Sequence, residues 1–253
     1  ITLNDNALDF DNTFYFTISK PEKINVLSIG KPAKFLEKIY TKDEFNYTST
    51  ILEKLNFNSI QKQHLILLNE VDVISTELIN SLSEFSKNGG NIVVIPSQNA
   101  QLNSYNSLLN KLNVGKIKSK VEGERKITSI KFKHPLISDV FEKEITNFQY
   151  PKTAFYFQTT FHNASSVINL DNNASFITAS KTNNTNFYWI SSPLNSKTSN
   201  FTKSPLVVPI FYNFGKNSLK FSELYYTITS KTSFDVKTTI EKDNVLEIAG
   251  DFT

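Results

Sequence analysis

The chain of 253 residues contains no cysteine. This absence excludes disulfide bonds, thiolate metal sites and cysteine nucleophiles together. It leaves the compartment open, because a cysteine-free protein is stable in both oxidising and reducing environments.

Long apolar runs are also missing from the sequence. No run reaches the ~18 residues that a membrane-spanning helix needs, and no signal peptide is present. The chain begins with "ITLNDNALDF", without an initiating methionine. We therefore expect a soluble piece of a longer protein.

The chain also lacks a strong net charge of either sign. The 27 basic and 24 acidic residues give a net charge of +3, which does not indicate a nucleic-acid partner. The densest basic segment, "KIKSKVEGERK" (Lys116–Lys126), also contains glutamates. We interpret it as a solvated pair of strands, with an anion-facing patch as the alternative. A hydrophobic content of 39% is enough for a sizeable core.

Three short apolar runs in the first half predict buried strands, and they are Ile24–Gly30, His64–Glu70 and Asn91–Pro96. The segments between them carry apolar residues at helical spacing. Residues 33–55 predict one or two helices, and residues 103–113 predict another. Strands that alternate with helices predict a parallel sheet that is covered by helices on both faces, which is a three-layer α/β fold.

The strongest helix prediction covers "STELINSLSEFSKNGG", which starts at Ser75. Ser75 is a good N-cap residue. An apolar stripe follows at helical spacing and comprises Leu78, Ile79, Leu82 and Phe85. The sequence Asn88-Gly89-Gly90 predicts a left-handed stop at the other end.

After Gly115 the pattern changes to short strands with Asn-rich turns, which predicts an antiparallel extension of the sheet. The strand "NFYWISS" is expected to rejoin the main sheet and to bury Trp189. "SPLVVPIFYNFGKN" predicts a helix that is closed by Gly215. Residues 1–20 and 221–253 alternate like strands, so we expect them to belong to a neighbouring β-rich domain, with the α/β domain at residues 21–220.

Three segments resemble known families: residues 24–97, "HPLISDVFEK" (His134–Lys143) and "FYWISSPLNSKTSNFTKSPLVVPIFYNF" (Phe187–Phe214). The first is similar to class I glutamine amidotransferase-like domains, and the second to amidotransferase-like and trehalose-utilisation-like domains. The third is similar to Bat-type, aerotolerance-associated membrane proteins of Bacteroidota. Together the resemblance covers about residues 12 to 230, and it implies a flavodoxin-like or amidotransferase-like fold.

The resemblance also implies a lost active site. Class I amidotransferases use a Cys nucleophile and a His-x-Glu pair, whereas this chain has Ser97 near the cysteine position and no His after Trp189. A serine without a base is not a usable nucleophile. The glycines of a G-x-S-x-G elbow are replaced by Ile95 and Asn99.

The candidate site residues follow two of the predicted strands. Ser97, Gln98 and Asn99 either line a groove for a ligand or partner, or form a capped loop. Glu70 and Asp72 could bind a metal or a ribose hydroxyl, cap the next helix, or face water. No phosphate-binding glycine motif is present, so we expect no cofactor.

The three histidines show no metal-ligand spacing, so we expect no metal site. We interpret His134 as a turn residue whose ring bonds to the backbone.

The function expected from these observations is a non-catalytic scaffold for protein or ligand binding. It would be the soluble, extracytoplasmic region of a membrane-anchored envelope protein, with other envelope proteins as partners and with anchoring segments outside this chain. One alternative is a hydrolase that uses Ser97, Glu70 and His134, if the three converge. Another is a small-molecule sensor that uses the groove at the strand ends.

Overall fold

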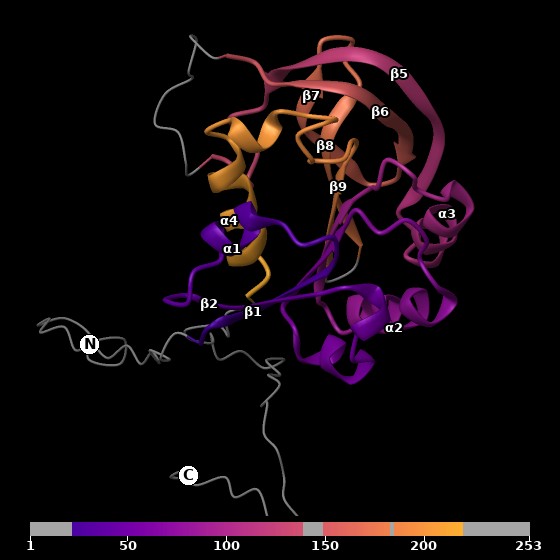
Figure 1. The fold of residues 1–253 in the computed structure, drawn as a ribbon, viewed down its shortest axis with the longest axis vertical. Coiled ribbons are helices and arrows are strands. Elements are labelled where there is room, and N and C mark those ends of the chain that lie inside the picture. Colours follow the sequence, from indigo (N-terminus) through magenta and orange to yellow (C-terminus); the bar gives the residue numbers. More distant parts are fainter. Residues whose placement is uncertain (1–21, 139–148, 183–184, 220–253) are drawn as a thin grey trace, which may run out of the picture. The chain divides into compact units, whose positions relative to one another are not determined.

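The computed structural model describes residues 22–138, 149–182 and 185–219 (Figure 1). These residues contain a nine-stranded sheet with the order β2-β1-β3-β4-β9-β8-β7-β5-β6. The β-rich segments expected at residues 1–20 and 221–253 lie outside the described residues, as do residues 139–143 of the resemblance segment His134–Lys143.

The parallel half of the sheet confirms the three predicted buried strands. Its strands are β1 (Ile24–Gly30), β2 (Phe45–Thr50), β3 (Leu65–Asn69), β4 (Asn91–Ile95) and β9 (Thr185–Ile190). Each of these strands pairs in parallel with its neighbour in this half. Every residue of β3 and β4 is buried, as expected for central strands that helices cover on both faces.

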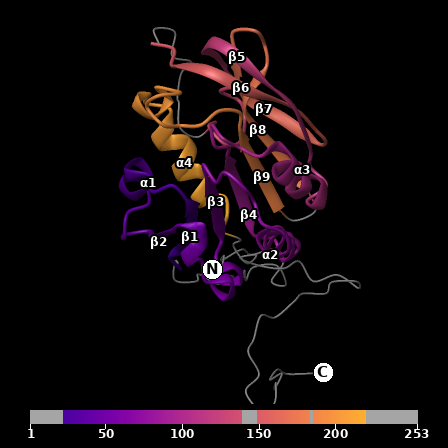
Figure 2. The same cartoon turned by 45° about the vertical axis from the view of Figure 1, so that its right-hand side comes forward.

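Helices cover both faces of the parallel strands (Figures 1 and 2). The α-helices are α1 (Lys34–Ile39), α2 (Thr76–Lys87), α3 (Leu102–Lys111) and α4 (Val207–Lys216). Short 3₁₀ turns are η1 (Leu52–Lys54), η2 (Phe57–Lys62) and η3 (Phe201–Lys203). Helices α1 and α4 pack in one apolar cluster, and α2 and α3 pack in the other, so the sheet separates two cores.

The antiparallel half confirms the predicted extension. Its strands are β5 (Gly115–Ile130), β6 (Lys152–Phe161), β7 (Ala164–Leu170) and β8 (Ser175–Thr182). The turn between β7 and β8 has Asn173 at φ 65°, a conformation that Asn tolerates well. The interpretation of Lys116–Lys126 as a pair of strands is wrong, because this segment lies within the single strand β5. Its hydrogen-bonding partners come from β6 instead.

The capping prediction for α2 is confirmed at both ends. The Leu78 N–H donates to Ser75 Oγ at 3.2 Å. At the other end the Gly90 N–H donates to the Phe85 carbonyl at 2.9 Å and the Gly89 N–H to the Ser86 carbonyl at 2.8 Å. Gly89 has φ 87°. This is a Schellman motif, which needs a residue that adopts the left-handed conformation without strain.

The helical interpretation of residues 33–55 is wrong for residues 45–50, which form β2. Its sequence, "FNYTST", is rich in aromatic and β-branched residues that favour a pleated surface. Phe45 is buried and Tyr47 is half-buried on the side of α1 and α4. The apolar residues at helical spacing therefore belong to two short helical segments, α1 and η1, which lie before and after the edge strand β2 in the chain.

Gly215 does not close its helix, because α4 continues to Lys216 and is capped by Asn217. A Cβ atom at Gly215 would lie 2.6 Å from Phe45 Cε1 and 3.0 Å from Tyr40 Cε1. The glycine is therefore a close-packing residue, which lets α4 approach the rings at the edge of the sheet.

Trp189 is fully buried at the centre of the sheet, as predicted. It pairs with Val94 of β4 in parallel and with Thr178 of β8 in antiparallel orientation. Strand β9 therefore joins the two halves. Across the three described ranges of the chain, no helix is both long enough and apolar enough to cross a membrane.

Candidate functional site

The carboxyl ends of the parallel strands bring four loops to one edge of the sheet. These loops contain Lys31, Glu70–Asp72, Ser97–Asn99 and Ser191–Asn195, which follow β1, β3, β4 and β9 in turn. We call this group the strand-end site. Ligands of open α/β sheets bind at such an edge, so it is the place to test the predicted residues.

Glu70 lies at the centre of the strand-end site. Its side chain is 5% exposed and its backbone has φ 52°. The carboxylate accepts the Leu194 N–H at 3.2 Å and the Asn195 N–H at 3.1 Å. The Asn195 Nδ2 donates to both carboxylate oxygens, at 3.1 and 3.0 Å, and Lys31 Nζ lies 3.3 Å from Oε2. Glu70 therefore holds the loop that follows β9.

Ser97 is fully buried. Its hydroxyl donates to the Asp72 carboxylate and accepts the Asn99 N–H at 3.1 Å. The structure therefore brings Ser97 and Asp72 together, in a capped loop rather than an open groove. Gln98 and Asn99 are exposed beside them.

Tyr105 of α3 joins two of these loops and was not predicted from the sequence. Its hydroxyl donates to the Val71 carbonyl and accepts the Ser97 N–H at 3.3 Å. Burial, followed by the nearby Asp72 and Glu70, raises the pKa of this phenol well above its ordinary value. The hydroxyl therefore stays protonated and acts as a fixed hydrogen-bond donor.

The segment from Ser191 to Asn200 is also bound to β6. Ser192 Oγ lies 2.6 Å from Thr153 Oγ1. The Lys152 N–H donates to Asn200 Oδ1 at 2.6 Å, and Ser199 Oγ donates to the Lys152 carbonyl at 2.9 Å. The segment thus connects Glu70 at one end with the first residues of β6 at the other.

His134 is not part of the strand-end site. Its Nδ1 accepts the Leu136 N–H at 3.1 Å, which fits the predicted bond to the backbone, and its Nε2 lies 2.9 Å from Ser165 Oγ in β7. Strand β7 is three positions from β4 in the sheet. At about 4.8 Å per strand, that separation is about 14 Å. Ser97, Glu70 and His134 therefore do not converge.

The chemistry available at the strand-end site is mainly structural. The buried carboxylate of Glu70 is bound by N–H groups and one ammonium, and the Ser97 hydroxyl is bound between Asp72 and a backbone N–H. Over the described part of the chain, no group of three or more His, Asp or Glu side chains could hold a metal ion.

Comparisons with known proteins identify the fold. No family model and no curated protein match the chain. A cytoplasmic protein of Salmonella typhimurium matches with a TM-score of 0.58 and 14% identity, over 76% of this chain and 98% of its own. A second cytoplasmic protein, from Salmonella typhimurium LT2, matches with a TM-score of 0.61 and 11% identity, over 78% of this chain and 100% of its own. A ThuA-like protein from Bacteroides uniformis matches with a TM-score of 0.50 and 10% identity, over 81% of this chain and 95% of its own.

Identities this low show the fold alone. The chain has a mixed α/β fold with a large sheet, and the ThuA-like protein shares this fold, which confirms the expected α/β fold class.

Proposed function

We propose that the chain is a non-catalytic binding scaffold with an amidotransferase-like fold. It acts as the extracytoplasmic region of a Bat-type envelope protein, anchored in the membrane by segments outside this chain, and binds other envelope proteins. The observation that carries the proposal is the state of Ser97, which stands near the nucleophile position but is fully buried and hydrogen-bonded to Asp72.

A serine nucleophile needs a base within hydrogen-bond reach and a path for its substrate. Ser97 has a carboxylate on one side and the Asn99 N–H on the other. The acid beside it, Glu70, is turned towards the Leu194 and Asn195 N–H groups. A network that is closed in this way supports a scaffold better than a hydrolase.

The Bat-type part of the proposal is supported by the segment Phe187–Phe214. This segment forms most of β9, the loop bound by Glu70, and most of α4. The resemblance therefore involves the centre of the sheet and one of its covering helices.

A fluorophosphonate probe tests the loss of catalysis. We expect no covalent adduct on the native chain by intact mass, while an active serine hydrolase in the same tube is labelled completely. Labelling of Ser97, absent from the Ser97→Ala variant, would overturn the non-catalytic proposal.

Localisation is tested with the complete protein in its own cells. We expect the reading frame to encode apolar spans of ~20 residues. The protein should fractionate with membranes, and residues 22–219 should be digested by a protease added outside the cytoplasmic membrane. Recovery in the cytosolic fraction would contradict the envelope assignment.

A further inference from the structure

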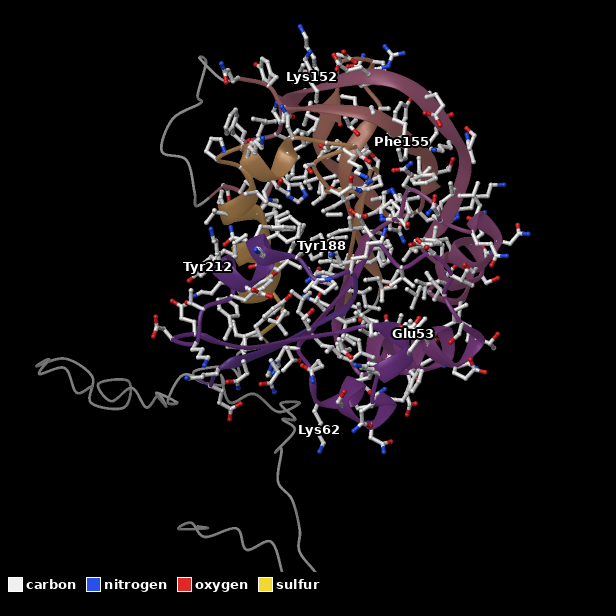
Figure 3. All side chains as sticks on the ribbon, viewed as in Figure 1. Glu53, Lys62, Lys152, Phe155, Tyr188 and Tyr212 are labelled. Atoms are coloured by element: carbon white, nitrogen blue, oxygen red, sulfur yellow. The ribbon has the colours of Figure 1, made fainter. Side chains whose placement is uncertain are left out.

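A second region of interest is a cavity of about 750 Å³ between β5, the start of β6 and the segment before α4, and none of its lining residues belongs to the strand-end site. Its lining includes Lys126, Tyr150, Pro151, Lys152, Lys203 and Pro205. Lys152 marks this region in Figure 3. The volume falls in the range of small-molecule sites, about 300–1,000 Å³.

The cavity is positively charged. Lys126 and Lys203 are exposed, and neither forms an ion pair with another described residue. Lys152 Nζ lies 2.7 Å from the Glu124 carboxylate, and Glu124 is not part of the lining. The described lining residues contribute three ammonium groups and no carboxylate, and Glu124 beside the lining offsets the charge of Lys152, which leaves Lys126 and Lys203 as the unpaired cations.

The backbone that carries these lysines is fixed. The Ile127 N–H donates to the Pro151 carbonyl at 2.8 Å, which ties β5 to the start of β6 beside Lys126. Lys152 and Asn200 exchange two hydrogen bonds, at 2.6 and 3.2 Å. The backbone therefore needs no ordering when an anion binds, and the entropic cost is confined to the lysine side chains, at about 0.5–1.5 kcal/mol for each one that becomes fixed.

Flat apolar surfaces complete the lining. Tyr150 is 41% exposed, and Pro151 and Pro205 line the same cavity. Helix α4 begins at Val207, two residues after Pro205, so its partially positive end follows the lining in the chain.

We propose that this cavity binds a small phosphorylated molecule. The Lys126 and Lys203 ammonium groups contact the phosphate, and the organic part lies against Tyr150 and the prolines. A phosphomonoester carries about −1.5 to −2 charges at neutral pH, so it matches several ammonium groups better than a single carboxylate does. The lining does not include Ser97, Glu70 or Asp72, so this proposal stands whether or not the scaffold proposal is correct.

Calorimetric titration of the chain tests the proposal. The probes are AMP and glucose 6-phosphate, with adenosine, glucose and inorganic phosphate as comparisons. We expect at least one of the two organic phosphates to bind, more weakly at high salt, and the two neutral compounds not to bind. Tighter binding of AMP would indicate a nucleoside as the organic part, and tighter binding of glucose 6-phosphate would indicate a sugar.

Two variants locate the binding. Lys126→Gln and Lys203→Gln should each weaken binding about tenfold, as expected for loss of one charge-assisted contact. Lys118→Gln removes the same charge from an exposed position of β5 outside the lining, and it should bind like the native chain.

Three results would overturn the proposal. The first is no binding by either organic phosphate. The second is an equal loss of affinity in Lys118→Gln, which would show only a general charge effect. The third is inorganic phosphate binding as tightly as both organic phosphates, which would show anion adsorption without a site for the organic part.

Discussion

Glu70 is the residue that organises the strand-end site. It combines a left-handed backbone, at φ 52°, with a carboxylate that is almost completely buried. Each of these features is unfavourable for a glutamate by itself. They are offset by the N–H groups of Leu194 and Asn195 and by the Lys31 ammonium.

Replacing Glu70 by Ala should lower the free energy of unfolding by about 2–4 kcal/mol, because two backbone N–H groups lose their acceptor inside the protein. Glu70→Gln keeps one acceptor oxygen and should lose less. Urea unfolding gives the free energies, and hydrogen exchange should accelerate at the Leu194 and Asn195 amides. Glu53→Ala removes an exposed carboxylate (Figure 3) and should have almost no effect, so equal losses in both alanine variants would contradict this role.

His134 makes the stability of the fold depend on pH. Burial, and then the nearby Lys131, lowers the pKa of this imidazole below its ordinary 6.5. The unfolded chain therefore binds a proton more readily than the folded chain does. The neutral ring stabilises the fold above pH 6.5, and that contribution is lost as the pH falls through the lowered folded value.

We expect the urea concentration at the unfolding midpoint to decrease as the pH is lowered from about 7.5 to about 5.5. In the His134→Asn variant this decrease should be smaller. His162→Asn, in an exposed turn, is the matched control. If the His134→Asn variant shows the same dependence of the urea midpoint on pH as the native chain, His134 is not the cause of that dependence.

The sequence predicted only part of the strand-end site. Strand ends can be found by local patterns, so Glu70, Asp72 and Ser97 were placed at the same edge of the sheet. Asn195 and Tyr105 were missed because their contacts depend on the folded chain. Asn195 lies 125 positions from Glu70, and no local pattern reports a pairing at that separation.

At the level of elements, buried strands and capped helices were predicted well because their signals are local. The errors among the strands fall on β2 and β5, which depend on neighbours. Strand β2 pairs with β1 at the edge of the sheet, and its apolar residues resembled a helical stripe. Strand β5 pairs with β6 as far as Lys126 and with β7 from Ile127, and its charged segment Lys116–Lys126 was interpreted as a pair of strands.

Helix α4 gives a test of close packing. Alanine favours a helix by about 1 kcal/mol over glycine, so Gly215→Ala would stabilise an exposed helix. Here the new methyl group meets Phe45 and Tyr40, and overpacking typically costs about 1–3 kcal/mol. We expect overpacking to dominate, which would lower the thermal midpoint.

A double-mutant cycle checks this explanation. Phe45→Leu makes room beside Gly215, so Gly215→Ala should cost less in that background. Equal costs in both backgrounds would show that the Phe45 contact does not matter.

At the scale of the described unit, one strand joins two half-sheets of different topology. Trp189 lies in that strand and is the single tryptophan of the chain. We expect the loss of its buried fluorescence in urea to coincide with the loss of exchange protection at Val94 and Thr178, its partners on either side. Earlier loss at Thr178 than at Val94 would show that the two halves unfold separately.

The central position of β9 also affects how the chain is made. Strands β1 to β4 and β5 to β8 leave the ribosome first, yet β9 lies between β4 and β8. Until Thr185–Ile190 emerges, both of those strands present an unpaired edge that can join another nascent chain. A ribosome that stalls before this strand would therefore release two incomplete sheets that are prone to aggregation, because the strand at the centre of the described sheet is the last of its strands to be translated.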